Sequence, residues 1–238
     1  GRRALPVLQW LADLAKATGR ILQVRLVKGA YWDTEIKRAQ EAGFETFPVF
    51  TRKVSTDVSY LACARFMLSR RDAFFPQFAT HNAQTVAAIS VMAGTDRRFE
   101  FQRLHGMGQA LYAQVTAAHG LAQPFRIYAP VGSHEDLLAY LVRRLLENGA
   151  NTSFVNRLAD DDAPIGEIIA DPVAQVRALA EVPHPRIVPP PKLFAGRSNS
   201  AGLATWHKPL REAALAGIEK ALAEKLTATP LVGGAGRS

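Results

Sequence analysis

The stretch Leu22-Gln-Val-Arg-Leu-Val-Lys-Gly-Ala-Tyr-Trp-Asp33 has the form of a strand that runs through a short turn into a helix. Apolar and polar side chains alternate over its first five residues and the run ends at Lys28, which is the pattern of a β-strand. Gly29-Ala-Tyr-Trp32 interrupts the alternation, and a helical pattern follows over 33–42. The sequence therefore predicts one strand–helix unit here, with glycine and aromatic residues at the junction.

Three more strand-like runs repeat this arrangement toward the carboxyl terminus. They are expected at 76–80, 99–104 and 125–129. The helices around them are expected at 57–69, 84–93, 109–118 and 133–149. Alternation of short strands with helices of this length predicts an α/β fold with a parallel sheet. Polar and aromatic residues gather after each strand, as they do at the active-site rim of a (β/α) barrel.

Composition is that of a globular protein without a membrane span. The 238 residues are 48% hydrophobic, and no apolar run approaches the roughly 18 residues needed to cross a bilayer. The one cysteine, Cys63, lies in an apolar helical run and is expected to be a buried thiol, which suits a reducing cytosol. The net charge of +8 is spread along the chain without interleaved aromatic residues, so nucleic-acid binding is not expected.

The helix expected at 133–149 has two different faces. Leucines form an apolar stripe at helical spacing, whereas Tyr140, Arg143, Arg144 and Glu147 share another face. Ser133 with Asp136 resembles a capping box, and Asn148-Gly149 ends the pattern. Two guanidiniums beside a ring and a carboxylate suit a small carboxylate ligand, although a solvated face with one Arg–Glu pair remains the alternative.

Together, the motifs resemble a known family. In chain order they are Arg25-Leu-Val-Lys-Gly-Ala-Tyr-Trp-Asp33, Thr51-Arg-Lys-Val54, Phe78-Ala-Thr-His-Asn82, Phe101-Gln-Arg-Leu-His-Gly-Met-Gly108, Tyr128-Ala-Pro-Val-Gly132 and residues 140–154. The series, within about residues 7–175, resembles the proline dehydrogenase domain of the bacterial proline utilization A family. The resemblance implies a flavin-containing (β/α)8 barrel that oxidises L-proline to pyrroline-5-carboxylate by hydride transfer to flavin N5. Electrons would then pass to membrane quinone.

Only four of the eight strand–helix units can be placed on this sequence. We therefore expect residues 1–155 to form the carboxyl-terminal half of the barrel, with the amino-terminal half as its partner. Residues 156–182 are expected to be a loop with a short helix. Residues 183–238 are expected to be a Pro- and Ser-rich linker with an amphipathic helix and a disordered end at 233–238. By the resemblance this extension leads toward an aldehyde dehydrogenase domain that uses NAD and is absent here.

The resemblance also assigns roles to residues at the strand ends. Arg25 and Tyr31 are the expected catalytic residues, with Arg25 beside flavin N5. Proline would be bound by Leu104, Tyr128, Tyr140, Arg143, Arg144 and Glu147. FAD would be bound by Arg25, Val27, Gly29, Ala30, Tyr31, Trp32, Thr51, Arg52, Lys53, His81, Asn82, Gln102, Leu104 and Glu147.

Elementary chemistry supports several of these assignments. Gly29 and Ala30 are small enough for the backbone to approach a ring system. The cationic and hydroxyl groups of Thr51-Arg-Lys53, close to the start of a helix, suit the pyrophosphate of a dinucleotide. The sequence has no Gly-x-Gly-x-x-Gly motif, so a Rossmann mode of binding is not expected.

Three alternatives remain open. His81 and His105 each follow a strand and could belong to a metal-dependent barrel hydrolase, but the further ligands that such a site needs are not evident, and no metal is expected. Lys28 lies at a strand end and is the candidate for a Schiff-base enzyme. The chain could also be a non-catalytic half-barrel. The resemblance favours a bacterial, cytoplasmic enzyme, with the full protein peripherally associated with the inner membrane face.

Overall fold

The computed structural model describes residues 1–29, 31–117, 123–149, 166, 169–225, 228–229, 231–233 and 235–236. The chain divides into two compact units. One comprises Gly1–Lys37 and Phe47–Val188, and the other comprises Arg38–Thr46 and Pro189–Ser238. The boundary therefore falls within a helix and not only in the linker that the sequence predicts.

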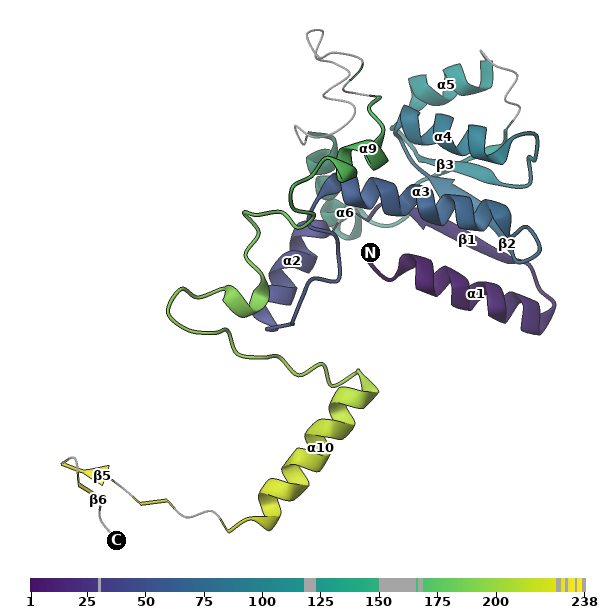
Figure 1. Ribbon diagram of the computed structural model, residues 1–238. Coiled ribbons are helices and arrows are strands. Elements are labelled where there is room, and N and C mark those ends of the chain that lie inside the picture. The colour runs from purple at the N-terminus through teal and green to yellow at the C-terminus, as the bar shows by residue number, and fades with distance from the viewer. Residues whose placement is uncertain are drawn as a thin grey trace. The chain divides into compact units, whose positions relative to one another are not determined.

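The first unit contains a four-stranded parallel sheet. Its strands are β1 (Leu22–Val27), β2 (Phe74–Ala79), β3 (Glu100–Leu104) and β4 (Phe125–Tyr128), in that order across the sheet (Figure 1). The register pairs Arg25 with Gln77, Gln77 with Glu100, and Leu104 with Tyr128. All four carboxyl ends therefore lie along one edge, and the predicted α/β half-barrel sheet is confirmed.

Helices follow the strands in the predicted order. They are α1 (Ala4–Thr18), α2 (Trp32–Glu41), α3 (Lys53–Ser69), α4 (Ala83–Ala93), α5 (Gln109–Ala117), α6 (His134–Gly149) and α9 (Pro172–Arg177). Helix α3 begins at Lys53, four residues before the predicted start at Asp57. The two residues form an ion pair of 2.8 Å across this first turn, an interaction that supports a helix.

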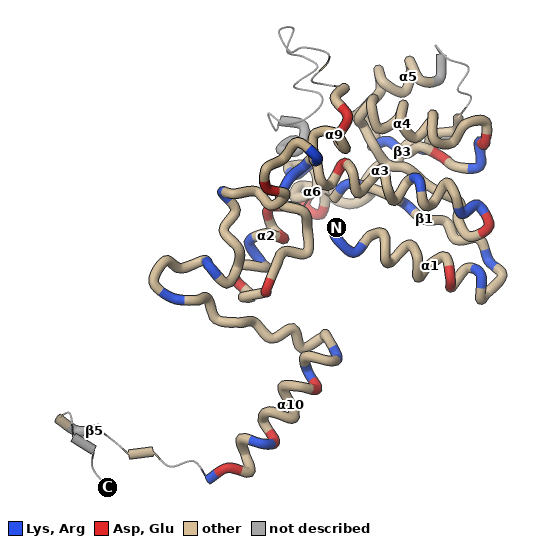
Figure 2. The backbone as a smooth tube through the Cα atoms, viewed as in Figure 1, with Lys and Arg blue, Asp and Glu red and all other residues tan. Residues whose placement is uncertain are grey.

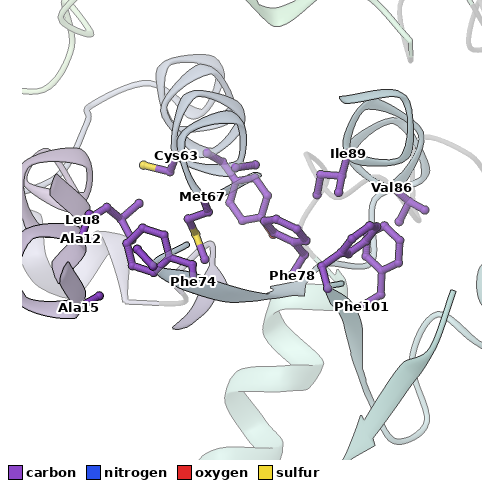
Figure 3. Packing of buried hydrophobic residues seen from close by; sticks show 14 of the residues in the cluster. Leu8, Ala12, Ala15, Cys63, Met67, Phe74, Phe78, Val86, Ile89 and Phe101 are labelled. Atoms are coloured by element: carbon purple, nitrogen blue, oxygen red, sulfur yellow. The ribbon is translucent and has the colours of Figure 1, made fainter. Parts of the chain in front are cut away.

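A hydrophobic core lies between the sheet and helices α1, α3 and α4 (Figure 3). Phe78 on β2 is fully buried and packs edge-on against Phe99, with ring centroids 5.6 Å apart. Met67 and Cys63 reach this core from α3, and burial raises the pKa of the Cys63 thiol. The prediction of a buried apolar cysteine is confirmed.

The other face of the sheet is polar. Because successive side chains of a strand point to opposite faces, the residues that alternate with the core phenylalanines face away from the helices. These residues are Arg25, Gln77, Glu100, Gln102 and Arg126. In a closed barrel this face would be the interior, where charged groups need partners.

The second unit holds the carboxyl-terminal extension. It contains a 3-10 turn, η1 (Pro190–Lys192), helix α10 (Lys208–Ala223) and a short antiparallel pair, β5 (Leu231–Val232) with β6 (Ala235–Gly236). The prediction of an extended linker at 183–200 thus missed η1. The prediction of a disordered end at 233–238 was wrong for Ala235–Gly236, because backbone pairing with β5 orders them. Positive and negative residues lie side by side along α10 (Figure 2).

The Arg38–Thr46 segment packs on the extension within this unit. Phe44 meets Trp206 edge-on with ring centroids 6.0 Å apart, and the side chain of Asn199 donates a hydrogen bond of 2.8 Å to the carbonyl of Gln40. Gly43 and Gly202 are joined by a backbone hydrogen bond of 3.1 Å. A Cβ on Gly202 would lie 1.4 Å from the carbonyl oxygen of Ala42, so only glycine fits this approach.

Among the residues that the structure describes, no helix could span a membrane.

Candidate active site at the strand ends

Arg25 is the centre of a polar cluster on the open face of the sheet. Its Nε donates a hydrogen bond of 2.8 Å to Oε1 of Gln102 on β3. Its guanidinium carbon lies 4.8 Å from the centre of the Tyr128 ring, at the end of β4. A cation over an aromatic face is attracted to the ring. The structure thus brings together three predicted site residues from β1, β3 and β4.

Burial raises the pKa of the Tyr128 hydroxyl, and the nearby Arg25 only partly opposes this effect. Tyr128 is therefore a neutral phenol at physiological pH. Its ring offers an apolar surface, while its hydroxyl remains able to donate or accept a hydrogen bond. Such a residue suits the wall of a pocket for a small amino acid.

Helix α6 brings its arginines to two of the predicted tyrosines. The guanidinium of Arg143 lies 5.1 Å from the centre of the Tyr31 ring, which belongs to the junction after β1. The guanidinium of Arg144 lies 5.1 Å from the Tyr140 ring, one turn earlier in α6. The Nε of Arg143 is buried and has no hydrogen bond with the residues that the structure describes, which does not favour the alternative of a fully solvated face at this position.

The predicted start of α6 is confirmed. The backbone N–H of Asp136 donates to Oγ of Ser133 at 3.3 Å, and this hydroxyl donates to Oδ2 of Asp136 at 2.7 Å. The carboxylate therefore closes the capping motif through the serine hydroxyl. Glu147 lies in α6, but its side chain is outside the described residues, so its predicted contact with the arginines stays a prediction.

The junction between β1 and α2 is open above its glycine. A Cβ on Gly29 would meet no atom within 4 Å. Tyr31 and Trp32 are 49% and 42% exposed, and the Trp32 indole donates a 2.7 Å hydrogen bond to the carbonyl of Phe50. An uncovered aromatic surface beside open backbone can accept a flat ring system. Ala30 lies outside the described residues.

Lys28, the last residue before this junction, is held by the first turn of α3. Its Nζ lies 2.5 Å from Oδ1 of Asp57, and Lys53 lies 2.8 Å from the other oxygen of the same carboxylate. Burial lowers the pKa of Lys28, although the ion pair with Asp57 opposes this shift. Asp57 was not among the predicted site residues. The signal that could have identified it is its position one helical turn after Lys53.

The predicted phosphate-binding residues at the start of α3 already have protein partners. Oγ1 of Thr51 accepts a 2.9 Å hydrogen bond from the backbone N–H of His184, and Nε of Arg52 donates one of 3.1 Å to the carbonyl of Val182. Thr51 and Arg52 therefore anchor the chain after α9. Lys53 remains 60% exposed on the outer side of its pair with Asp57, and it is the best placed of the three to reach an anion.

His81, after β2, accepts a 3.0 Å hydrogen bond at Nε2 from the backbone N–H of Leu104. Nε2 is therefore unprotonated and Nδ1 carries the hydrogen. Burial lowers the pKa of His81, and the nearby Arg103 and Arg144 lower it further. A Cβ on Gly108 would lie 3.0 Å from Cδ2 of the ring, so this glycine leaves room for the imidazole. The neutral ring can donate one hydrogen bond to a ligand.

Asn82 has a structural role that the sequence assignment did not include. Its side-chain oxygen accepts a 2.9 Å hydrogen bond from the backbone N–H of Thr85 and caps α4. Leu104 is buried at the end of β3, where the resemblance expects it to line the pocket. Val27 lies at the exposed end of β1.

The described part of the chain holds no group of three or more His, Cys, Asp or Glu residues that could bind a metal.

Glu100 is the main polar residue of the cluster that the sequence reasoning missed. Its carboxylate accepts hydrogen bonds from Gln77 at 2.9 Å and from Gln102 at 2.8 Å. Arg126 binds both of its oxygens at 3.0 Å. Burial alone would raise the pKa of Glu100, but the hydrogen bonds from Arg126 and Gln102 hold it below the usual value. A charged residue between two core phenylalanines was the available signal.

The four parallel strands, with polar and aromatic residues beyond their carboxyl ends, are the arrangement found in part of a (β/α)-barrel enzyme. A family model for proline dehydrogenase matches residues 1–157. The chain is 60% identical over 210 residues to the bifunctional protein PutA of Klebsiella aerogenes, a match that covers 83% of this chain and 16% of that protein. It is 32% identical over 148 residues to proline dehydrogenase 1, mitochondrial, of Homo sapiens, covering 58% of this chain and 24% of that protein.

Solved structures agree with these matches. A crystal structure of bifunctional proline utilization A superimposes with a TM-score of 0.86 at 51% identity, covering 97% of this chain and 23% of that chain. The D779W mutant of the Bradyrhizobium japonicum protein gives 0.85 at 52% identity, covering 95% and 23%. The chain therefore belongs to the proline dehydrogenase family. It spans about a sixth of the length of the PutA relative from Klebsiella aerogenes.

Proposed function

We propose that this chain supplies the carboxyl-terminal half of an FAD-dependent enzyme that oxidises L-proline to pyrroline-5-carboxylate. The proposal rests on two cation–ring pairs, Arg25 with Tyr128 and Arg143 with Tyr31, together with family membership. The first pair lies on the polar face of the sheet, and the second joins α6 to the junction after β1. This arrangement suits an aromatic cofactor next to a small carboxylate.

The donor set of this chain fits a flavin. Gly29 leaves open space above the backbone, Arg25 offers a cation, and His81 offers one N–H from a neutral ring. Lys53 is placed to pair with the pyrophosphate, with Thr51 and Arg52 shaping the loop beneath it. Gln102 and Trp32 would border the ring system. Bound FAD would supply the electron-accepting centre, taking a hydride from the carbon beside the proline nitrogen.

The side chains of this chain would bind and orient proline. Arg143 and Arg144 would clamp its carboxylate through charge-assisted hydrogen bonds, with Glu147 holding the arginines in place. Tyr128, Tyr140 and Leu104 would surround the five-membered ring and exclude water. Since no side chain needs to exchange protons with the reacting carbon, the protein contributes mainly position and electrostatics.

The wider context is proposed by analogy with the family. We propose that four further strands of an amino-terminal half complete the barrel, that membrane quinone accepts the electrons, and that the extension leads toward an NAD-dependent aldehyde dehydrogenase domain. The full protein would then be a bacterial cytoplasmic enzyme that associates with the inner membrane face. The division of the chain into a barrel half at 1–155, a loop with a short helix at 156–182 and a linker region at 183–238 is part of this proposal.

The proposal is tested by Arg143→Met and Arg144→Met in a polypeptide that carries a complete barrel with this sequence as its second half. Loss of one charge-assisted contact is worth about 1.5–3 kcal/mol, so the KM for proline should rise at least about tenfold. Flavin content should stay near that of the parent. Arg65→Met is the matched control, because Arg65 is exposed on α3 and should leave the KM unchanged. An unchanged KM in both α6 variants would remove this helix from the site.

A Schiff-base enzyme is the second candidate, since burial lowers the pKa of Lys28. The close ion pair with Asp57 argues against it, because the carboxylate stabilises the ammonium form and occupies the amino group. Borohydride trapping with substrate separates the two: covalent attachment at Lys28 supports the Schiff base, whereas a yellow protein bleached by proline supports the dehydrogenase. A colourless protein that never binds flavin would instead favour a non-catalytic half-barrel.

A further inference from the structure

Glu100 lies on β3 two residues before Gln102 and four before Leu104, the predicted flavin contacts on this strand, and its carboxylate accepts more side-chain hydrogen bonds than either of them in the described cluster. It is only 6% exposed, although it carries a full charge. Three side chains converge on it from three strands: Gln77 from β2, Gln102 from β3 itself and Arg126 from β4. A buried carboxylate with this many partners is costly to keep, so its role needs an explanation.

The hydrogen bonds form a directed chain that ends at Arg25. An ionised carboxylate can only accept, so the amide of Gln102 must turn its NH2 group toward Glu100. Its oxygen Oε1 then points the other way and accepts the hydrogen bond from Nε of Arg25. If the amide were reversed, an oxygen would face the carboxylate and an NH2 group would face the guanidinium. The charge of Glu100 therefore selects the amide orientation that can bind Arg25.

The bond to Nε fixes the plane of the guanidinium. Nε joins the group to its aliphatic stem, so a hydrogen bond at this atom restricts rotation about the last side-chain bonds. The same guanidinium also contacts the ring of Tyr128, whose centre lies 4.8 Å from the guanidinium carbon. The neutral amide of Gln102 thus orients Arg25, and the charge of Glu100 sets the direction of that amide.

We infer that Glu100 is a positioning residue for the flavin chemistry: through Gln102 it holds Arg25 in the orientation that stabilises the reduced cofactor. The inference rests on the proposed function, because it needs a flavin beside Arg25. Glu100 itself would touch neither the flavin nor proline. Its depressed pKa keeps the carboxylate ionised, and hence acceptor-only, throughout the physiological range.

The test is Glu100→Gln in the complete-barrel protein, read out by the reduction potential of the bound flavin. The new amide can donate as well as accept, so Gln102 loses its fixed orientation and Arg25 its anchor. The potential should become more negative, and the rate of flavin reduction by saturating proline should fall about tenfold, with little change in proline binding. Direct electrostatics predict the opposite sign, because removing a negative charge near a flavin makes it easier to reduce.

A double-mutant cycle tests the route. Gln102→Met should lower the potential by itself, and adding Glu100→Gln to it should lower the potential no further, since the link is already broken. Gln77→Met is the matched control: Gln77 donates to the same oxygen of Glu100 but from β2, outside the chain that leads to Arg25. That variant should keep the parent potential.

Several outcomes would overturn the inference. These are a parent-like or more positive potential in Glu100→Gln, a parent-like potential in Gln102→Met, a further fall in the double variant, and loss of flavin from both single variants, which would indicate a folding role. The potential is measured by chemical titration and does not need proline turnover. A parent protein that binds flavin but is not reduced by proline would therefore contradict the proposed function separately.

Discussion

At the scale of single residues, Arg25 is the sheet residue that we propose to lie beside the flavin. It is the only member of β1 with a side-chain hydrogen bond to another strand in the described chain, and it faces a tyrosine ring as well. A cation in this position stabilises negative charge that appears nearby. If this charge develops only when the flavin is reduced, the contribution of Arg25 should grow along the reaction.

We therefore expect Arg25→Met to make the flavin harder to reduce and to slow its reduction by at least about tenfold, while proline binding changes less. Arg25→Lys retains the charge without the Nε contact and should lie between this variant and the parent. Stopped-flow reduction and potentiometry, with bound flavin counted beforehand, provide the measurement. If Arg25→Met keeps its flavin and reduces at the parent rate and potential, Arg25 has no part in the chemistry.

Sequence reasoning identified the residues at the site more readily than their partners. Arg25 lies within an otherwise mostly apolar strand, Tyr128 ends a strand and Arg143 lies on a two-faced helix, and in each place the type of side chain is itself informative. Glu100 and Asp57 were missed because their roles depend on hydrogen bonds across strands and helices, which a linear pattern does not show. The capping role of Asn82 was hidden by the functional role that the resemblance gave it.

At the scale of elements, the turn between α4 and β3 is held by one carboxylate. Asp96 accepts a 2.9 Å hydrogen bond from the backbone N–H of Arg98 and pairs with the side chains of Arg98 at 3.0 Å and Arg71 at 3.3 Å. The hydrogen bonds from the Arg98 side chain and backbone lower the pKa of Asp96 to about 2. The ion pair with Arg71 also connects this turn to the residues between α3 and β2.

The lowered pKa predicts a pH dependence of stability. The stabilisation by ionised Asp96 is complete above its unfolded pKa of about 4 and is lost as the pH falls toward the folded value. Asp96→Asn should therefore lower the free energy of unfolding by about 1 kcal/mol near pH 7, after allowance for solvent screening, and by much less at pH 2. Denaturant unfolding of the complete-barrel protein at both pH values measures this. Glu45→Gln, at an exposed loop position, is the control and should leave the free energy of unfolding unchanged at both pH values. If Asp96→Asn lowered the free energy of unfolding equally at both pH values, the explanation would be wrong.

The order and type of the elements in the barrel half were predictable, but several boundaries were not. Strands with alternating or buried apolar patterns and helices with strong caps were identified within a few residues. The start of α3 was placed too late because the pairing of Lys53 with Asp57 extends the helix. The β5–β6 pair was missed because backbone pairing over two residues per strand leaves almost no sequence signal.

At the scale of the whole molecule, β1 and β4 are the edges of the described sheet. Each presents unpaired backbone donors and acceptors, and the polar face of Arg25 and Glu100 is built for an interior. We expect the isolated chain to associate or aggregate, and its co-expression with the amino-terminal half of a related proline dehydrogenase barrel to give a discrete, yellow complex. Light scattering after size-exclusion chromatography and the flavin absorbance measure these outcomes. A stable, cooperatively unfolding monomer of the chain alone would count against the half-barrel interpretation.

The glycine contact between residues 43 and 202 has a consequence for how this sequence can be divided. Since Arg38–Thr46 shares a compact unit with Pro189–Ser238, a cut at residue 188 would leave Phe44 without its aromatic neighbour and the carbonyls of Gln40 and Gly43 without their donors. Trimming the tail would thus expose apolar surface in a loop more than 140 positions upstream. Truncated or grafted versions of this barrel half should carry the extension through at least Trp206, or redesign the loop with it.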